Sequence, residues 1–564
     1  MESQDKNSKK VNRIIAADAL LGKVDPCNDH VWRLTSGQGE PVALSLFTTY
    51  GLRAYGMRIF PRFHMKNEVV TNPTAFAQIP TIPFQTPDFV EIRFRPFPTI
   101  DAVLRVWVPS SQVIMGQVTL LLNGDQPDLL VMEWVAMLEP FPGGRKMSAK
   151  EHGVNTVLAG KTRDIEPVFL LTGIPGTESS SYPSLGLELA LRPSVPRQFT
   201  WVLASLENED LSFYTARRFA ATMLENEQLK QEISQQNSTL HVKCGNSHTD
   251  GVLLSNNDRI RQLVLPPFGS FHHHTIVQSR EQDNGFSSAR DGSDSGPSWG
   301  VQTSVDAFIA SRILFPTQPE LLKGILQNFL DQQSDNGSID MLTSWTVRRS
   351  GINTTPLLAG LIVDVFNYTQ DKDWLARCFP LLLLNIKNWF SVESDRDQDG
   401  FPEWQHILQT GLSQEYSTGN NLKQKQEMLI HCTESPALAA LIFRECECLA
   451  TMAAMLDDPE TAAWLEITGK HLFNNIQSCW NTEEAFFQYR DMLNHTLDHT
   501  NKILTYKRNG TFPVREVKSL TSFTTITVAC VEDSLCSCEI QLKSLTQTHT
   551  LTAKSFSFQG RVGS

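Results

Sequence analysis

The chain lacks the features of an exported or membrane-spanning protein. Its first residues, MESQDKNSKKVNRI, are polar and charged, whereas a signal peptide needs an apolar stretch of about 7 to 15 residues. The longest apolar runs, such as residues 379–384, fall well short of the roughly 18 residues that span a bilayer. We therefore expect a cytoplasmic chain with no membrane partner.

Positive charge is also scarce, because 49 Lys and Arg stand against 61 Asp and Glu, for a net charge of -12. No stripe of Lys and Arg compensates locally, so nucleic acid is excluded as a partner. A neutral ligand such as a sugar is compatible with this balance. The ten cysteines show no CxxC spacing, which predicts reduced thiols rather than a zinc site.

Two catalytic signatures are missing as well. The sequence contains no Gly-rich phosphate loop and no HExxH helix. These absences argue against nucleotide and zinc-protease chemistry.

What the sequence does contain is a change of pattern along its length. Residues 1–214 hold short alternating apolar runs separated by Pro and Gly, such as AVLRVWVP and LGLELALRP, which predict an N-terminal β-sandwich. Residues 215–250 have helical periodicity and predict a linker helix.

The second half of the chain is mostly helical in pattern. Residues 251–502 contain apolar helical segments at about 301–314, 319–332, 355–369, 373–391, 434–456 and 459–480. Short connections such as YTQDKDWL and LDDPETAAWL separate them in pairs, which indicates stacked α-hairpins. Residues 503–564 return to strand-like runs and predict a small β-domain or insertion.

Four segments of the helical region resemble bacterial glycosidases related to amylo-α-1,6-glucosidases and to glycoside hydrolase family 63. They are RDGSDSGPSWGVQTSVDAF, TTPLLAGLIVDVFNYTQDKDWL, DRDQDGFPEWQHILQTGL and ESPALAALIFRECECLATMA. The resemblance covers about residues 215–490. It implies a six-hairpin glycosidase, with an (α/α)6 toroid whose central pit binds an oligosaccharide or glucan.

The expected fold class is therefore mixed, with an N-terminal β-sandwich, an incomplete toroid and a small C-terminal β-region. A closed toroid of this kind needs more helices than the segments predicted here, and the resemblance implies that a later helix bears the general base. We therefore expect a chain that is truncated at its C-terminus, or a second chain that supplies the missing helices.

The first candidate sugar-binding stretch is the loop before the helix at 301–314. Asp291, Asp294, Trp299, Gln302 and Asp306 combine acceptors for sugar hydroxyls with an aromatic face on which a pyranose can stack. By resemblance, this stretch lines the sugar pit. The alternative for Asp291 and Asp294 is a solvated turn, and for Asp306 it is a carboxylate at a helix N-terminus.

The second candidate stretch is DRDQDGFPEW. Asp395, Asp397 and Asp399 stand at alternate positions before a glycine, as oxygen ligands do at the start of a calcium loop. A histidine at the twelfth position excludes a full EF-hand. Two interpretations stay open, a Ca²⁺ site closed by Glu403 or another oxygen and a solvated acidic turn. By resemblance, Glu403 and Trp404 sit at the rim of the pit.

Hydrolysis with inversion needs two carboxyl groups about 6.5 to 9.5 Å apart, one to protonate the leaving oxygen and one to activate water. Relatives carry the acid near QTGLSQEYSTG, where this chain has Glu415 one residue late. Either Glu415 takes the role of the general acid through a local shift, or the acid is missing. Glu415 is the candidate, and the base is not found in this chain. Glu434, at a helix start, and Trp345 are further candidates for contact with the sugar.

Two functions follow from these residues. The first is a glycoside hydrolase that acts on α-linked gluco-oligosaccharides or glucans by an inverting two-carboxylate mechanism, which requires no cofactor, with Ca²⁺ as the one candidate ion. The alternative is a non-catalytic carbohydrate-binding or interaction protein, derived from a degenerate or truncated glycosidase.

Overall fold

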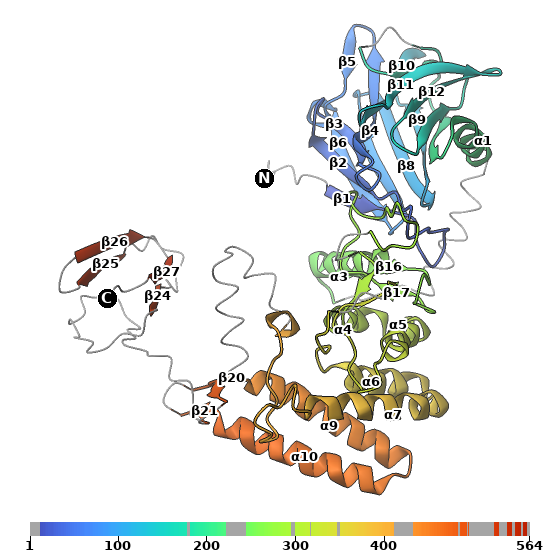
Figure 1. The fold of residues 1–564 in the computed structure, drawn as a ribbon. Helices are drawn as coiled ribbons and strands as arrows, with labels where there is room; N and C mark the ends of the chain where they lie inside the picture. Colours follow the sequence, from blue (N-terminus) through green and yellow to red (C-terminus); the bar gives the residue numbers. More distant parts are fainter. Residues whose placement is uncertain are drawn as a thin grey trace. The chain divides into compact units, whose positions relative to one another are not determined.

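The computed structural model describes most of the chain and divides it into two compact units, residues 1–497 and 498–564. The described residues are 12–177, 181–221, 244–294, 299–315, 317–346, 350–410, 433–482, 485–492 and 495, with strands at 524–528, 538–543, 548–553 and 556–560. Figure 1 shows that strands dominate the first part of the larger unit and helices its second part. A sheet-rich N-terminal region followed by a helical region is thereby confirmed.

The sheet-rich region consists of two antiparallel sheets. The first has the order β1-β2-β3-β4-β10-β14, with β5 paired to β4. Its strands are β1 (Asn12–Ile15), β2 (Trp32–Gln38), β3 (Ala43–Thr48), β4 (Ala54–Met65), β5 (Glu68–Val70), β10 (Asp128–Pro140) and β14 (Ser184–Leu191). The second has the order β11-β12-β13-β15-β9-β8-β7-β6. Its strands are β6 (Gln78–Gln85), β7 (Phe89–Arg95), β8 (Ile100–Ser110), β9 (Val113–Leu122), β11 (Arg145–His152), β12 (Asn155–Lys161), β13 (Glu166–Leu171) and β15 (Arg197–Leu206).

One hydrophobic core lies between these sheets. Alternate residues of β10, Leu130, Met132 and Trp134, are buried in the same cluster as residues of β9 and β15, because successive side chains of a strand point to opposite faces. Trp134 of the first sheet lies 5.0 Å from Trp201 of the second, centroid to centroid. Gly116 makes room for this contact, since a Cβ atom there would lie 2.4 Å from the Trp201 ring.

Within the described residues, the helical region contains three antiparallel hairpins. They are α4 (Ser304–Leu314) with α5 (Pro319–Asp331), α6 (Leu358–Thr369) with α7 (Lys372–Trp389), and α9 (Pro436–Met455) with α10 (Pro459–Ser478). Helices α1 (Glu209–Ala220) and α3 (Ser247–Gln262) precede them. The six predicted hairpin helices are confirmed to within a few residues at each end.

Local sequence explains why these helices begin where they do. Asp371 and Asp458, in the two similar connections, accept hydrogen bonds from the backbone N–H groups three residues later, and such N-caps stabilise a helix start. Ser435 does the same before Pro436 of α9, where proline is pre-organised for the first helical position. The short connections therefore end one helix and start the next.

The hairpins share one apolar core. On α5, Leu322, Ile325, Leu326 and Phe329 follow helical spacing and are buried with residues of the other hairpins. Helix α6 has no side-chain cap of its own. Instead the buried carboxylate of Glu445, on α9, accepts hydrogen bonds from the first N–H groups of α6.

Short strand pairs complete the described structure. In the larger unit these are β16 (Val264–Leu265) with β17 (Thr275–Ile276), β18 (Val301–Gln302) with β19 (Thr343–Ser344), β20 (Thr433–Glu434) with β23 (Arg490–Asp491), and β21 (Trp480–Asn481) with β22 (Phe486–Phe487). The smaller unit contains β24 (Thr524–Val528) with β27 (Phe556–Gly560), and β25 (Cys538–Lys543) with β26 (Thr548–Ala553). None of the helices in the described ranges combines the length and apolar character that crossing a bilayer requires.

Candidate functional site

The long connections of the helical region all leave from one end of the hairpins. The turns at 315–318, 370–371 and 456–458 are short, whereas long segments follow α5, α7 and α10. Because the two helices of each hairpin are antiparallel, the starts of α4, α6 and α9 lie at the same end as these long segments (Figure 1). Loops at the end of a rigid scaffold are where binding and catalytic residues usually lie.

A buried polar network joins the segments at this end. The hydroxyl of Ser304 donates to the carbonyl of Thr355 at 2.8 Å, and the hydroxyl of Thr354 donates to Ser304 at 3.0 Å. Thr355 then donates to the carbonyl of Gln409 at 2.7 Å, and the Gln409 amide donates to the carbonyl of Asn353 at 2.7 Å. The starts of α4 and α6 are thus fixed to the segment that follows α7.

The acidic loop after α7 turns back on itself around its own carboxylates. Gly400 has a φ of +80°, which glycine adopts without strain, and its N–H donates to Asp395 at 3.1 Å. The N–H of Phe401 donates to Asp399 at 2.8 Å. The loop therefore holds several carboxylates close together within a few residues.

Two segments distant in sequence close this loop. Glu403 forms a β-bridge with Glu434, and strand β20, which contains Glu434, pairs with β23 after α10. Arg490 of β23 donates to the carboxylates of Glu434 and Asp399, and its guanidinium lies 4.8 Å from the ring centroid of Phe401. The loops after α7 and α10 and the start of α9 thus converge on one acidic cluster, which comprises Asp395, Asp397, Asp399, Glu403 and Glu434.

Burial makes the negative charge of the acidic cluster costly. Desolvation raises the pKa of Glu403 to about 7, and the charges of Asp397, Asp395 and Glu434 add to that effect, opposed by a hydrogen bond from the Arg396 N–H. Burial likewise raises the pKa of Asp395 to about 6. Perturbed carboxyl groups of this kind are typical of functional sites.

Three buried carboxylate oxygens of the cluster have no hydrogen-bond partner. They are Asp395 Oδ1, Glu403 Oε1 and Glu434 Oε1, on residues that are 3%, 1% and 0% exposed. One oxygen each of Asp395, Asp397 and Glu403 lie within 4.8 Å of one another. Since Ca²⁺ binds oxygens at about 2.3 to 2.6 Å, a single ion between them fits these residues.

The aspartates of the 291–306 stretch lie in a local turn. Asp294 is exposed and accepts hydrogen bonds from the Ser287 hydroxyl and the N–H groups of Ser288 and Ala289. Asp291 is also exposed and accepts from the N–H of Ser293. Their hydrogen bonds are thus local to the loop, and none joins them to the acidic cluster.

The three candidate tryptophans are buried. Trp299 donates to the carbonyl of Pro26 at 3.2 Å and packs edge-to-face against Trp345. Trp404 packs edge-to-face against Trp389 in the core of the hairpins. Each of the three candidates is 3% exposed, and so their rings are covered by protein.

Gln302 and Asp306 contact the scaffold around α4. The Gln302 side chain is buried, accepts from Thr275 and donates to the carbonyl of Ile325. Asp306 accepts from the hydroxyl of Thr303, which in turn accepts from the Asp306 N–H. This reciprocal arrangement caps the start of α4.

Glu415 lies outside the described residues. Of the other predicted residues, the structure brings Asp395, Asp397, Asp399 and Glu403 together with Glu434. Sequence reasoning missed Arg490 and His495 as members of this site; a His495 ring nitrogen lies 3.4 Å from Glu434. No spacing rule could have found them, because 91 residues separate Arg490 from Asp399.

An exposed aromatic ribbon runs beside the acidic cluster and was also missed. Exposure alternates between β22 and β23, so that Gln488 and Arg490 are buried while Phe487 and Tyr489 are exposed. Trp480 stacks edge-to-face on Phe487 at 4.9 Å and is exposed as well. We call Trp480, Phe487 and Tyr489 the aromatic ribbon. The sequence signal was the alternation in FFQYR.

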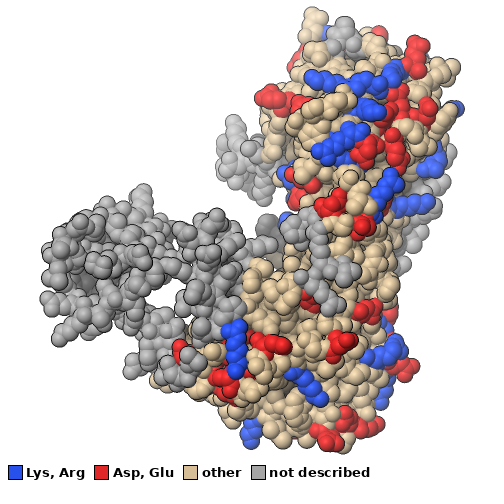
Figure 2. Space-filling model, viewed as in Figure 1, with Lys and Arg blue, Asp and Glu red and all other residues tan. Residues whose placement is uncertain are grey.

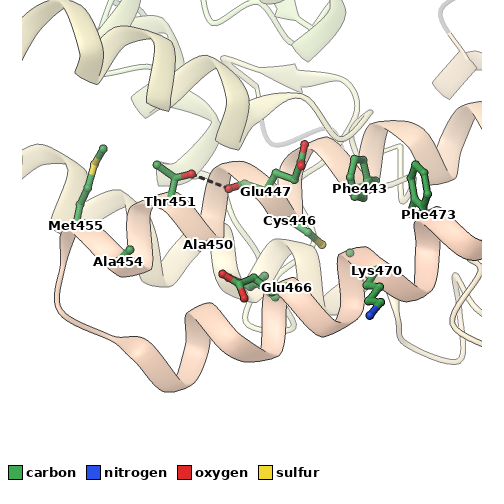
Figure 3. A pocket seen from close by; sticks show the side chains of 12 residues that line it. Phe443, Cys446, Glu447, Ala450, Thr451, Ala454, Met455, Glu466, Lys470 and Phe473 are labelled. Carbon is green, nitrogen blue, oxygen red and sulfur yellow. Dashed lines mark hydrogen bonds between the residues drawn. The ribbon is translucent and has the colours of Figure 1, made fainter.

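A groove of about 800 Å³ between α9 and α10 is separate from these features. Figure 3 shows its lining, with Phe443 and Phe473 at one end, Met455 at the other and the side chains of Glu447 and Glu466 on facing helices. None of the predicted site residues lines it.

The surface carries no single-sign patch on the face that Figure 2 shows. Lys and Arg alternate there with Asp and Glu over the sheet-rich region, while much of the described helical surface is uncharged. The described residues on this face show no basic stripe.

Comparison with known proteins finds a family similar to much of the helical region. Residues 300–527 match the family of mannosylglycerate hydrolase MGH1-like glycoside hydrolase domains. The match confirms the resemblance to glycoside hydrolases predicted from the sequence, and it covers the hairpins and the acidic cluster. No curated protein matches this chain.

Two solved structures are similar to the chain at low identity. One is described as a kojibiose phosphorylase from the human microbiome, with 9% identity and a TM-score of 0.42 over 81% of this chain. The other is a bacterial glucoamylase complexed with acarbose, with 12% identity and a TM-score of 0.45 over 85% of this chain. The chain spans 62% of the phosphorylase and 70% of the glucoamylase.

Proposed function

We propose that this chain is a carbohydrate-active protein of the glycoside hydrolase type that acts on α-linked gluco-oligosaccharides or glucans. In this proposal the hairpins belong to an (α/α)6-type toroid and the two sheets form a β-sandwich. The observation that carries the proposal is the family match over residues 300–527, because that stretch includes every loop that converges on the acidic cluster.

The sugar binds, in this proposal, at the loop end of the hairpins. The buried network around Ser304, Thr355 and Gln409 is neutral, and such groups position loops that hydrogen-bond sugar hydroxyls. Among the described residues, the exposed rings beside the cluster belong to the aromatic ribbon rather than to the buried candidate tryptophans. We therefore assign pyranose stacking to the faces of Trp480 and Tyr489.

The acidic cluster itself has the dimensions of a cation site. An inverting pair of carboxyl groups stands about 6.5 to 9.5 Å apart, with a water between them. The candidate oxygens of Asp395, Asp397 and Glu403 lie within 4.8 Å of one another, which is too close for that role and suits Ca²⁺. Bound there, Ca²⁺ would supply charge compensation that fixes the loop beside the sugar.

Protonation of the leaving oxygen is assigned to Glu415, which stands one residue after the place of the acid in the family that the sequence resembles. Asp291, Asp294 and Asp306 remain candidate acceptors for sugar hydroxyls. The general base is not assigned to a residue of this chain.

A second candidate substrate follows from the name of the matching family, which is that of mannosylglycerate hydrolase-like domains. An α-mannoside of glyceric acid carries a carboxylate, so its binding would need a cationic group near the site. Arg490 contacts the acidic cluster, but its guanidinium is engaged by Glu434 and Asp399. This favours the neutral glucoside.

The test is incubation of the purified full chain, with Ca²⁺, with α-1,4- and α-1,6-linked gluco-oligosaccharides and with mannosylglycerate. Released glucose and mannose are measured by anion-exchange chromatography, and binding is measured by calorimetry. We expect glucose release that Glu415→Gln abolishes and that Glu447→Gln, a control on the exposed face of α9, leaves unchanged.

Other outcomes discriminate between the hypotheses. Turnover that survives Glu415→Gln removes that residue from the mechanism. Binding of oligosaccharide without release of sugar favours the non-catalytic carbohydrate-binding protein. If neither binding nor release occurs with any of these sugars, the proposed function is wrong.

A further inference from the structure

The acidic cluster divides into two halves that share Asp397. One oxygen each of Asp395, Asp397 and Glu403 lie within 4.8 Å of one another, and the same holds for the ligand atoms of Asp397, Asp399, Glu434 and His495. We call the first set the carboxylate half and the second the arginine half. The two halves differ in what neutralises them.

The arginine half already contains a cation. Arg490 is 8% exposed and donates through Nε to Glu434 and through Nη2 to Asp399. The planar guanidinium always carries its charge, and its donors suit carboxylates on two sides. Because Arg490 lies in β23, and β23 pairs with β20, the backbone fixes the charge in place.

The carboxylate half has no such partner. Among the described residues, neither Asp395 nor Glu403 forms an ion pair with Lys or Arg, and each keeps one buried oxygen without a hydrogen-bond partner. A buried carboxylate without a counter-charge costs several kcal/mol. The oxygens are spaced for one ion at the distances that Ca²⁺ prefers.

We propose that Arg490 is a built-in cation that fills one of two adjoining cation positions, so that this chain binds one divalent ion in the carboxylate half and none in the arginine half. The inference rests on the cation site of the proposed function. Removing the guanidinium would leave Asp397, Asp399, Glu434 and His495 as a second set of ligands. Arg490 thus sets the number of ions that the cluster takes.

The test counts ions bound to the full chain by calorimetry with CaCl₂ and by Tb³⁺ luminescence. We expect one ion for the wild type and for Arg490→Lys, which keeps a cation, and two for Arg490→Gln. The matched control is Arg33→Gln, which removes an arginine paired with Glu281 in the sheet-rich region and should leave one ion. Unchanged stoichiometry and affinity in Arg490→Gln would overturn the inference.

A second pair of variants keeps the inference testable if Arg490→Gln does not fold. In the wild-type background, Asp395→Asn should weaken Ca²⁺ binding at least 100-fold, whereas Asp399→Asn should change it less than fivefold. Equal losses in the two variants, or two ions in the wild type, would contradict the division into halves. A wild type that binds no ion would instead remove the cation site of the proposed function, while its sugar-release test stands separately.

Discussion

Two buried acids of the sheet-rich region, Asp29 and Glu133, contrast with two at the loop end of the hairpins, Asp395 and Glu403. Asp29 is fully buried and accepts two hydrogen bonds from the guanidinium of Arg280. Glu133, also buried, is paired with Arg62 and His64. Each of these acids has its counter-charge within the protein.

At the loop end, by contrast, Asp395 and Glu403 are equally buried and lack a Lys or Arg partner among the described residues. A paired buried charge fixes two segments to each other, whereas an uncompensated one destabilises the fold until something binds. The comparison separates acids that hold the structure together from acids that, in our proposal, are arranged for a cation.

The largest effect should come from breaking a paired charge. Arg280→Met leaves Asp29 buried without its partner, so we expect a loss of about 3–5 kcal/mol in the free energy of unfolding, measured by urea denaturation. Arg33→Met is the control, because the Arg33–Glu281 pair is 33% and 44% exposed and should contribute less than about 1 kcal/mol. Equal losses in both variants would contradict the comparison.

A second variant removes a carboxylate that binds backbone rather than arginine. Glu445→Ala leaves the N–H groups of Ala359 and Gly360 without the acceptor they have now, and we expect a loss of about 2–4 kcal/mol. Glu447→Ala, on the exposed face of the same helix, should change stability by less than about 0.5 kcal/mol. Thermal melts of both variants provide the measurement, and a small effect at Glu445 would show that α6 starts without this cap.

Neutralising an uncompensated acid should raise the stability of the chain in the absence of Ca²⁺, and should remove the stabilisation that Ca²⁺ gives. At pH 7.5 without divalent ions, Glu403→Gln should stabilise the chain by about 1 kcal/mol, because it removes a buried charge. In the wild type, Ca²⁺ at 100 times its Kd should add about 2.7 kcal/mol, and Glu403→Gln should abolish that gain. Melts with EDTA and with CaCl₂ check both, and a Ca²⁺ effect that survives in the variant would contradict the assignment of Glu403.

The pH dependence of stability tests a third kind of buried acid, one whose carboxylate is bound by backbone N–H groups. Burial raises the pKa of Glu445 from 4.5 to about 7, so the folded state holds its proton more tightly than the unfolded state does. Its contribution is therefore complete below about pH 4.5 and is lost as pH rises through about 7. We expect wild-type stability to fall by roughly 1–2 kcal/mol more than that of Glu445→Gln between pH 5 and 8. If urea unfolding shows that the wild type and Glu445→Gln lose stability equally over this pH range, then Glu445 is not the source of the pH dependence.

The smallest effect concerns the aromatic ribbon. Tyr489→Ala should weaken oligosaccharide binding by roughly 0.5–1.5 kcal/mol, the usual size of an aromatic stacking contribution, and should leave the melting temperature unchanged because Tyr489 is exposed. The matched control is Tyr368→Ala, because Tyr368 is also exposed and lies near the C-terminal end of α6. Equal binding by both variants would remove the ribbon from the sugar site.

The sequence predicted the helices well because their apolar periodicity and their Asp, Ser and Pro start signals are local. It also predicted that the DRDQDG loop would gather carboxylates, since alternate acids before a glycine turn back on themselves. It could not reveal that Trp299 and Trp404 are buried, because a tryptophan in a core and one on a sugar platform look alike in a single sequence. Nor could it pair Arg490 with Glu434, which only the packing of α10 against α9 brings together.

The uneven lengths of the hairpin connections have a practical consequence. The turns at 370–371 and 456–458 lie at the end of the bundle opposite the acidic cluster and carry only helix caps. A fluorophore or an affinity handle attached at Gln370 or Asp457, both already in the left-handed backbone region, would report on the domain or immobilise it without touching the loops proposed to bind sugar.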